Sequence, residues 1–313
     1  MLKLGLLESR SEHWHGTAGG HDGEAMDFRQ KIAVVTGASS GIGRVTAITL
    51  AQAGATVIAT ARRESLLQEV STACRQHTPD SCHITGDLGD KAFAQQLVDE
   101  TVERYGRIDI LVNNAAVPMH RPLYEISVDE AEEVMRINFL SCLWTSFAAI
   151  PHMLLQGEGG EEGGVIVNVS SFVATVAPTH ETIYAASKGA MNSFSRGLWN
   201  DLAGSGVHCV LVIPGPIDTP IWDKFEDDNA YSGKLYPPQM VADEIVAAIG
   251  KRRFEVTVPR RNPSLVAARV LATLVPSLIR KGVARMNPVS PKLVDDARDR
   301  ARAGQRMGLG KKP

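Results

Sequence analysis

Short runs of β-branched and other apolar residues alternate with longer helical segments from Lys31 onward, and this alternation most restricts the fold. Parallel strands need long crossover connections, so the pattern predicts a parallel sheet covered by helices, which is an α/β fold. We expect seven strands, at residues 31–36, 56–60, 82–85, 108–113, 165–169, 207–213 and 254–258. Helices are expected at residues 42–53, 64–77, 90–105, 128–156, 181–203 and 238–252.

The composition restricts the class of protein. The chain has 313 residues, of which 44% are hydrophobic, so it can bury a core as one large domain or two smaller ones. Its formal net charge of -2 offers no field to attract nucleic acid, which is therefore not an expected partner. The four cysteines form no Cys-x-x-Cys pair and have no nearby histidine pairs, which argues against a disulfide framework and a zinc site. We expect a reducing, cytoplasmic location and no metal.

The two ends of the chain differ from its middle. Residues 1–25 show no regular period and no apolar run of signal-peptide length, so we expect a disordered, dispensable N-terminal tail. We expect one folded domain over residues 26–258 and a helical C-terminal extension over residues 259–313.

A glycine-rich stretch, Thr36-Gly-Ala-Ser-Ser-Gly-Ile-Gly43, follows the first expected strand and runs into the first helix. Glycine permits a tight turn and lets the backbone approach a pyrophosphate, whose charge then meets the amide groups at the helix start. Glycines alone also suit a purely structural turn. Their position between a strand and a helix is the one that a dinucleotide-binding loop requires.

The end of the second expected strand bears on which nicotinamide nucleotide binds. NAD sites usually have Asp or Glu there to hold the ribose hydroxyls, whereas this chain reads Thr60-Ala61-Arg62-Arg63. A guanidinium can pair with a 2′-phosphate, so we expect NADP(H), with Arg62 as the main contact and Ser40 as a helper. The alternative is a solvated arginine pair at a helix start.

Tyr184 and Lys188 are four residues apart in an expected helix, so a phenol and an ammonium would project from one face. An ammonium near a phenol favours the phenolate, and we expect the pKa of Tyr184 to lie below its usual value of about 10. Such a tyrosine can act as an acid or base nearer neutral pH. The same spacing also fits a packed ring beside a solvated charge.

Together these motifs resemble the short-chain dehydrogenase/reductase family, over about residues 28–258. The matching motifs are TGASSGIG at 36–43, NNAA at 113–116, Asn138, Ser171, YAASK at 184–188, and Pro214-Gly215 with Thr219. Their order and spacing agree with the family as well as their residue types. The resemblance implies a single Rossmann-type domain with a doubly wound parallel sheet of about seven strands.

The resemblance also implies roles for four catalytic residues. Tyr184 would be the general acid for carbonyl reduction or the base for alcohol oxidation, and Lys188 would lower its pKa and bind the nicotinamide ribose. Ser171 would hold the substrate oxygen, and Asn138 would hold a water that relays protons to Lys188. The implied cofactor-binding set is Gly37, Ser39, Ser40, Gly41, Ile42, Gly43, Arg62, Asp87, Leu88, Asn114, Tyr184, Lys188, Pro214, Gly215, Ile217 and Thr219.

Two further segments carry expectations about substrate and partners. Residues 214–236 lack regular periodicity directly after a strand and predict a lid or substrate loop, whereas the Gly and Glu cluster at 157–164 predicts a solvated loop. Residues 263–286 predict a basic amphipathic helix that lies on a membrane surface or packs against protein. It has no aromatic anchor, so we favour packing on the protein or a partner subunit, where it would close the substrate pocket.

The sequence thus predicts an NADP(H)-dependent oxidoreductase that interconverts a ketone or aldehyde and an alcohol. The resemblance suggests a homodimer or homotetramer, with helices 128–156 and 181–203 between subunits. One alternative is a non-catalytic NADP-binding protein that acts through its C-terminal surface. Another is a 3-oxoacyl thioester reductase, although the acidic loop at 214–236 offers no basic patch for a carrier protein.

Overall fold

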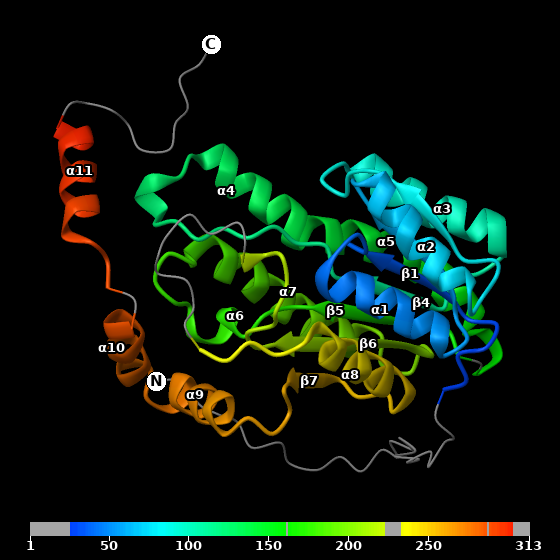
Figure 1. Cartoon of the computed structure of the whole chain (residues 1–313). Helices are drawn as coiled ribbons and strands as arrows, with labels where there is room; N and C mark the ends of the chain where they lie inside the picture. The colour runs from blue at the N-terminus through cyan, green and yellow to red at the C-terminus, as the bar shows by residue number, and fades with distance from the viewer. Residues whose placement is uncertain (1–25, 161, 223–232, 287, 303–313) are drawn as a thin grey trace.

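A single parallel sheet of seven strands forms the centre of the molecule, in the order β3-β2-β1-β4-β5-β6-β7. The computed structural model describes residues 26–160, 162–222, 233–286 and 288–302 (Figure 1). The strands are β1 (Ile32–Thr36), β2 (Thr56–Ala61), β3 (Cys82–Thr85), β4 (Ile110–Asn113), β5 (Gly164–Val169), β6 (Val207–Pro214) and β7 (Glu255–Val258). The α/β fold with a parallel sheet is confirmed, and each strand begins within two residues of its expected start.

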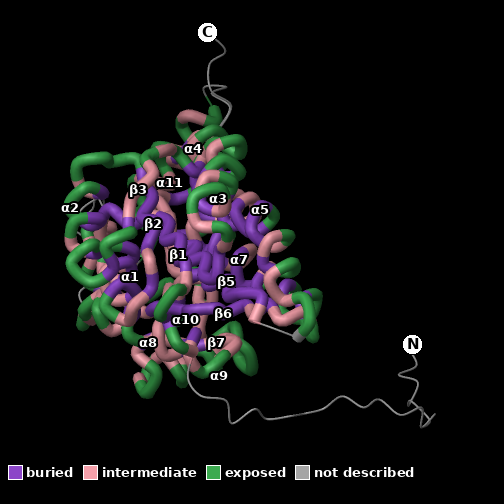
Figure 2. The backbone as a smooth tube through the Cα atoms, turned by 90° about the vertical axis from the view of Figure 1, so that its right-hand side faces the viewer, coloured by how far each residue is buried: buried purple, intermediate pink, exposed green. Residues whose placement is uncertain are grey.

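Helices cover both faces of this sheet. They are α1 (Gly41–Gln52), α2 (Glu64–Arg75), α3 (Lys91–Tyr105), α4 (Val128–Met135), α5 (Ser141–Gln156), α6 (Val173–Val176), α7 (Thr182–Asp201) and α8 (Pro238–Gly250). Short 3₁₀ turns lie at Leu123–Glu125 and Glu158–Gly160. Successive side chains of β1 enter different cores, because Ala33 and Val35 pack with α1, α2 and α8 while Val34 packs with α3, α5 and α7. Figure 2 shows the buried strands between these layers.

The expected single helix at 128–156 is continuous but contains a turn of different geometry. Its start carries the capping box that Ser127 and Glu130 predict. Between α4 and α5, residues Arg136–Leu140 form a π-helical turn, which widens the backbone. By length and composition Val128–Gln156 could cross a membrane, but half of its apolar window is buried, as in a core helix of a globular protein.

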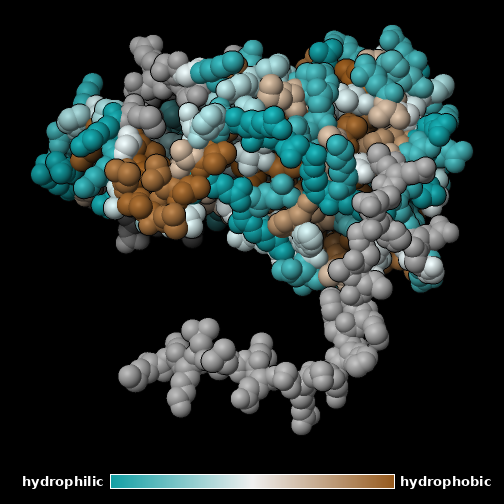
Figure 3. All heavy atoms as spheres, turned by 90° about the horizontal axis from the view of Figure 1, so that it is seen from below, coloured by the Kyte–Doolittle hydropathy of each residue, from teal (hydrophilic) through white to brown (hydrophobic). Residues whose placement is uncertain are grey.

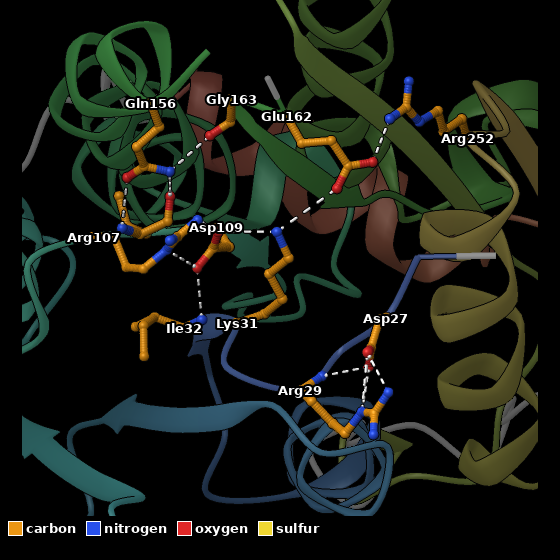
Figure 4. A network of polar contacts seen from close by, with 11 residues as sticks. Asp27, Arg29, Lys31, Ile32, Arg107, Asp109, Gln156, Glu162, Gly163 and Arg252 are labelled. Atoms are coloured by element: carbon orange, nitrogen blue, oxygen red, sulfur yellow. Dashed lines mark hydrogen bonds and ion pairs between the residues drawn. The ribbon is translucent and has the colours of Figure 1, made fainter. Parts of the chain in front are cut away.

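A network of hydrogen bonds and ion pairs lies at the amino-terminal edge of the sheet (Figure 4). Asp109 is 1% exposed, and its carboxylate accepts hydrogen bonds from the Ile32 amide at 2.8 Å and from the Arg107 guanidinium at 2.6 Å and 2.9 Å. Its neighbour Lys31 also pairs with Glu162, which in turn binds Arg252. Glu162 belongs to the segment predicted to be a solvated loop, and its side chain is 37% exposed while its carboxylate links Lys31 and Arg252.

Three helices follow β7: α9 (Pro263–Leu274), α10 (Pro276–Met286) and α11 (Pro291–Arg302). The predicted continuous helix over 263–286 is interrupted before Pro276, which cannot continue the helical hydrogen bonding. The three helices run along one side of the sheet domain (Figure 1). The division of the chain into domains at residue 258 stays a prediction, and residues 1–25 lie outside the described part.

Loss of the Asp109 carboxylate should destabilise the protein, whereas loss of a comparable ion pair on the surface should not. Asp109→Ala leaves the buried Ile32 amide and the Arg107 guanidinium without their acceptor, and should lower the free energy of unfolding by about 2–4 kcal/mol. Urea denaturation measures this. The control is Asp27→Ala, which removes an equally spaced Asp–Arg pair with Arg29 in solvent and should leave the midpoint unchanged. Equal effects of both variants would contradict the account.

Candidate active site

A cleft of about 310 Å³ opens at the carboxyl ends of the strands, beside the point where the connections diverge from β1 toward β2 and β4. Open α/β sheets bind ligands at this kind of crevice, since the flanking loops separate there. Twelve of the sequence-predicted residues line it: Gly37, Ser39, Ser40, Gly41, Ile42, Arg62, Asp87, Leu88, Asn114, Tyr184, Lys188 and Thr219.

Glycine is required at two positions of the loop between β1 and α1. Gly37 has φ +65°, and a Cβ there would lie 2.8 Å from the Ala115 Cα. At Gly43 a Cβ would lie 2.4 Å from the Gly37 carbonyl oxygen and 2.4 Å from the Asn114 amide. Asn114 fastens the loop to the end of β4, because its Nδ2 donates to the Thr36 carbonyl at 3.0 Å. The loop between β1 and α1 therefore packs so closely against neighbouring backbone atoms that Gly37 and Gly43 have no room for a side chain.

The start of α1 is arranged to meet an anion. Its N-cap residue is Ser40, whose side chain makes no capping bond within the described chain and instead accepts a hydrogen bond from Arg63 Nη2 at 2.8 Å. The same Arg63 nitrogen donates to Ser39 Oγ at 2.9 Å. A helix start with amide groups and a guanidinium beside it can bind a phosphate. The sequence favoured Arg62, but it is Arg63 that contacts the loop serines, while Arg62 lines the cleft.

Tyr184 and Lys188 both line the cleft from α7, as the spacing predicts. Lys188 is 2% exposed, and its Nζ donates to the Val169 carbonyl at 2.8 Å. Burial lowers the pKa of Lys188 to about 8, since the charged form loses its hydration.

The expected fall in the pKa of Tyr184 is wrong for the protein chain itself. Burial of the phenol and the negative charge of Glu181 raise this pKa, and a hydrogen bond with Ser171 acts in the opposite direction. The physical reason lies in the direction of Lys188, whose ammonium donates to the Val169 carbonyl. Tyr184 therefore keeps its proton well above neutral pH.

Ser171 and Asn138 stand beside the cleft rather than in its lining. Ser171 follows β5, and its hydroxyl accepts from the Val173 amide at 3.2 Å and acts to lower the pKa of the Tyr184 phenol. Asn138 is fully buried in the π-helical turn, where its oxygen accepts from the Val117 amide at 2.7 Å. Its Nδ2 donates to the Val117 carbonyl at 3.0 Å and to Ser187 at 3.1 Å. Asn138 thus joins the loop after β4 to the residue before Lys188.

Four other predicted cofactor residues support the cleft from outside its lining. Gly43 lies under the glycine loop, and Pro214 is the last residue of β6, where it pairs with Val258. The Gly215 amide donates to the Val258 carbonyl at 2.7 Å, and Ile217 is 4% exposed beside Tyr236. The predicted lid over 214–236 falls partly on residues 223–232, which lie outside the described part.

The sequence did not single out a polar cluster that borders Tyr184. Glu181 precedes Tyr184 by three residues, and its carboxylate contacts His120 Nδ1 at 2.8 Å. The His180 ring meets the His120 ring edge-on, with 5.6 Å between ring centroids. The short spacing from Glu181 to Tyr184 was a usable signal, but the partner His120 comes from a distant loop.

Comparison with known proteins agrees with the fold and the motifs. Residues 31–230 match the short chain dehydrogenase family. An uncharacterized oxidoreductase of Staphylococcus saprophyticus is 34% identical over 225 residues, which cover 72% of this chain and 93% of that protein. An uncharacterized oxidoreductase of Bacillus subtilis is 35% identical over 196 residues, 62% of this chain and 65% of that protein. The chain therefore belongs to the short chain dehydrogenase family and is an oxidoreductase.

A solved structure supports the same assignment. It is a short chain dehydrogenase/reductase from Burkholderia phymatum in complex with NAD, which superposes with a TM-score of 0.72 at 28% identity. The match covers 85% of this chain and 99% of that one.

Glu181 gives a test of the electrostatics at Tyr184. Its negative charge disfavours the phenolate, so Glu181→Gln should lower the pKa of Tyr184. The measurement is an alkaline titration of near-ultraviolet phenolate absorbance, with the signal of the matching Tyr184→Phe protein subtracted to isolate one of the five tyrosines. Glu103→Gln, on the exposed face of α3, is the control and should leave the titration unchanged. An unchanged Tyr184 titration in Glu181→Gln would refute this coupling.

Proposed function

We propose that the protein is an NADP(H)-dependent oxidoreductase that interconverts a ketone or aldehyde and an alcohol, with Tyr184 as general acid and base. One observation carries the proposal: Tyr184 and Lys188 line the same cleft as the glycine loop and the start of α1. One ligand bound in this cleft could therefore contact both the acid–base pair and the helix start that binds an anion.

The residues of the cleft fit a nicotinamide nucleotide, the class of ligand bound by the Burkholderia relative. The start of α1 would hold the pyrophosphate, and Asp87, Leu88 and Asn114 would border the adenosine. Lys188 would bind the nicotinamide ribose, and Thr219 the carboxamide. When bound, the nucleotide supplies the hydride that the protein itself cannot provide.

Arg62 and Arg63 support a preference for NADP(H). Both line the cleft at the end of β2, where an acidic residue would be needed to hold the two ribose hydroxyls of NAD. Arg63 already bonds with Ser39 and Ser40, so its charge stands over the phosphate loop. A 2′-phosphate would meet two guanidinium groups there.

The protonation of Tyr184 suits reduction of a carbonyl. Burial and Glu181 keep the phenol protonated near neutral pH, so Tyr184 can donate a proton to the oxygen that becomes an alcohol. The Ser171 hydroxyl, whose effect on the pKa of Tyr184 shows that the two groups interact, would stabilise the charge that develops on that oxygen. Lys188 would return a proton to the resulting phenolate, through a water held near Asn138.

Exposed apolar side chains support a homo-oligomer. Phe147 and Leu155 of α5 are 70% and 65% exposed, and Trp199 of α7 is 41% exposed. Large apolar groups of this kind on two adjacent helices suit a subunit interface. The four cysteines are free thiols, which suits the reducing cytoplasm that we propose as the location.

Replacement of the phenol tests the catalytic assignment. Tyr184→Phe should lower kcat for NADPH-dependent carbonyl reduction by about 10²–10⁴-fold, because the proton donor is lost. NADPH binding, followed by nucleotide fluorescence, should stay within about twofold, since most contacts lie elsewhere in the cleft. Tyr105→Phe, which alters a hydroxyl bonded to the Asp80 carbonyl, is the control and should keep full activity. Unchanged turnover in Tyr184→Phe would rule out the assignment.

Replacement of the two arginines tests the cofactor preference. The wild-type protein should favour NADPH over NADH by about tenfold or more in kcat/KM, equivalent to about 1.4 kcal/mol. Arg62→Ala and Arg63→Ala together should remove that preference while NADH kinetics change little. Arg75→Ala, at the far end of α2, is the matched control. A tenfold preference of the wild type for NADH would contradict this part of the proposal.

A further inference from the structure

The helix α9 has one face on the protein and one face in solvent. Its inner side chains Leu265 and Ala268 pack against the small apolar cluster of Phe172, Leu211 and Ile213. Val266, Val270 and Leu274 follow at intervals of four residues, are 54%, 49% and 73% exposed, and line one wall of an open groove of about 540 Å³ beside β7. Residues at this spacing align along one face of a helix, so the three form an apolar stripe.

The stripe continues beyond the break at Pro276. Val275 is 44% exposed, and Leu278 in the first turn of α10 is 53% exposed. Figure 3 shows these helices as a continuous hydrophobic patch at the left of the molecule. We call Val266, Val270, Leu274, Val275 and Leu278 the outer patch. Exposed apolar groups that gather in this way usually mark a contact surface.

The charge of the extension is opposite to that of the rest of the chain. Residues 259–313 contain thirteen lysines and arginines and three aspartates, a net charge of +10, whereas residues 1–258 contain twenty and thirty-two, a net charge of -12. From residue 259 to 286 there are six cations and no acidic residue. A strong separation of charge within one chain favours contact of the cationic part with an anionic surface.

Part of this charge is neutralised within the molecule and part is not. Arg269 pairs with Glu255, and Arg260 lies 3.9 Å from Glu244. Arg280, Lys281 and Arg285 of α10 make no ion pair with any described residue, and all three are exposed. Arg261, which precedes α9, is also exposed and makes no ion pair with any described residue, so three of the four uncompensated cations of residues 259–286 belong to the helix that directly continues the outer patch.

We propose that α9 and α10 form a docking surface for an anionic lipid membrane. The outer patch would enter the boundary between headgroups and acyl chains, and Arg280, Lys281 and Arg285 would meet the anionic headgroups. Residues 259–313 contain no aromatic residue, so the attachment is peripheral and depends on salt.

Vesicle binding of the full chain tests the proposal. Vesicles of phosphatidylglycerol and phosphatidylcholine should bind the protein in a sedimentation assay at low salt, and pure phosphatidylcholine vesicles should not. Arg280→Glu, Lys281→Glu and Arg285→Glu together should weaken binding by about tenfold or more. Val270→Ser, Leu274→Ser and Leu278→Ser together should do the same. The charge-matched control is Lys91→Glu, Arg104→Glu and Lys251→Glu, three exposed cations elsewhere, which should bind as the wild type does.

The outcomes are distinguishable from a loss of folding or of function. All of the altered side chains are exposed, so thermal unfolding and NADPH binding should match the wild type in each variant. Failure of the wild type to bind anionic vesicles would overturn the proposal, as would equal weakening by the control substitutions. A lower molar mass of the serine variant in solution, with vesicle binding unchanged, would show that the outer patch contacts another copy of the chain.

Discussion

The parallel direction of all seven strands is the constraint on which the site depends. It places the ends of β1, β4 and β5 at one edge of the sheet, so Gly37, Asn114 and Ser171 lie along the same edge although they are distant in sequence. The connections from β1 and β4 then leave toward opposite sides, and the space between them is a cleft bordered by backbone. Close approach at Gly37 and Gly43 keeps the start of α1 directed into this cleft. The other residues of the site are positioned by this arrangement of the strands and the cleft.

Burial acts on the two titrating groups of the site in a consistent way. It raises the pKa of Tyr184 and lowers that of Lys188, because each charged form loses hydration. Glu181 adds to the effect on the tyrosine, so the proton of the phenol is held firmly until an oxygen atom is placed to receive it. Buried ionisable groups destabilise a fold unless they are paired, and the Val169 carbonyl and His120 provide the partners for Lys188 and Glu181. The proposed chemistry uses groups whose protonation the fold already sets.

Local sequence patterns were enough to predict the sheet, the glycine loop and the capping box at Ser127, since each depends on neighbours within a few residues. Features that depend on long-range contacts were not predictable. Asn138 in the π-helical turn bonds to the distant Val117, and the ammonium of Lys188 is directed to the end of β5. The choice of Arg63 over Arg62 as the partner of Ser39 and Ser40 depends on the angle at which the chain leaves β2. The exposure of the outer patch required knowledge of which face of α9 the sheet domain covers.

The account rests on the claim that one cleft holds both the nucleotide and the acid–base pair. A crystal structure of the protein grown with NADP would test this most directly. The account predicts density for the pyrophosphate over the first turn of α1, the 2′-phosphate beside Arg62 and Arg63, and the nicotinamide end directed toward Tyr184. Nucleotide density outside this cleft, or an orientation that places the adenosine against Tyr184, would contradict it.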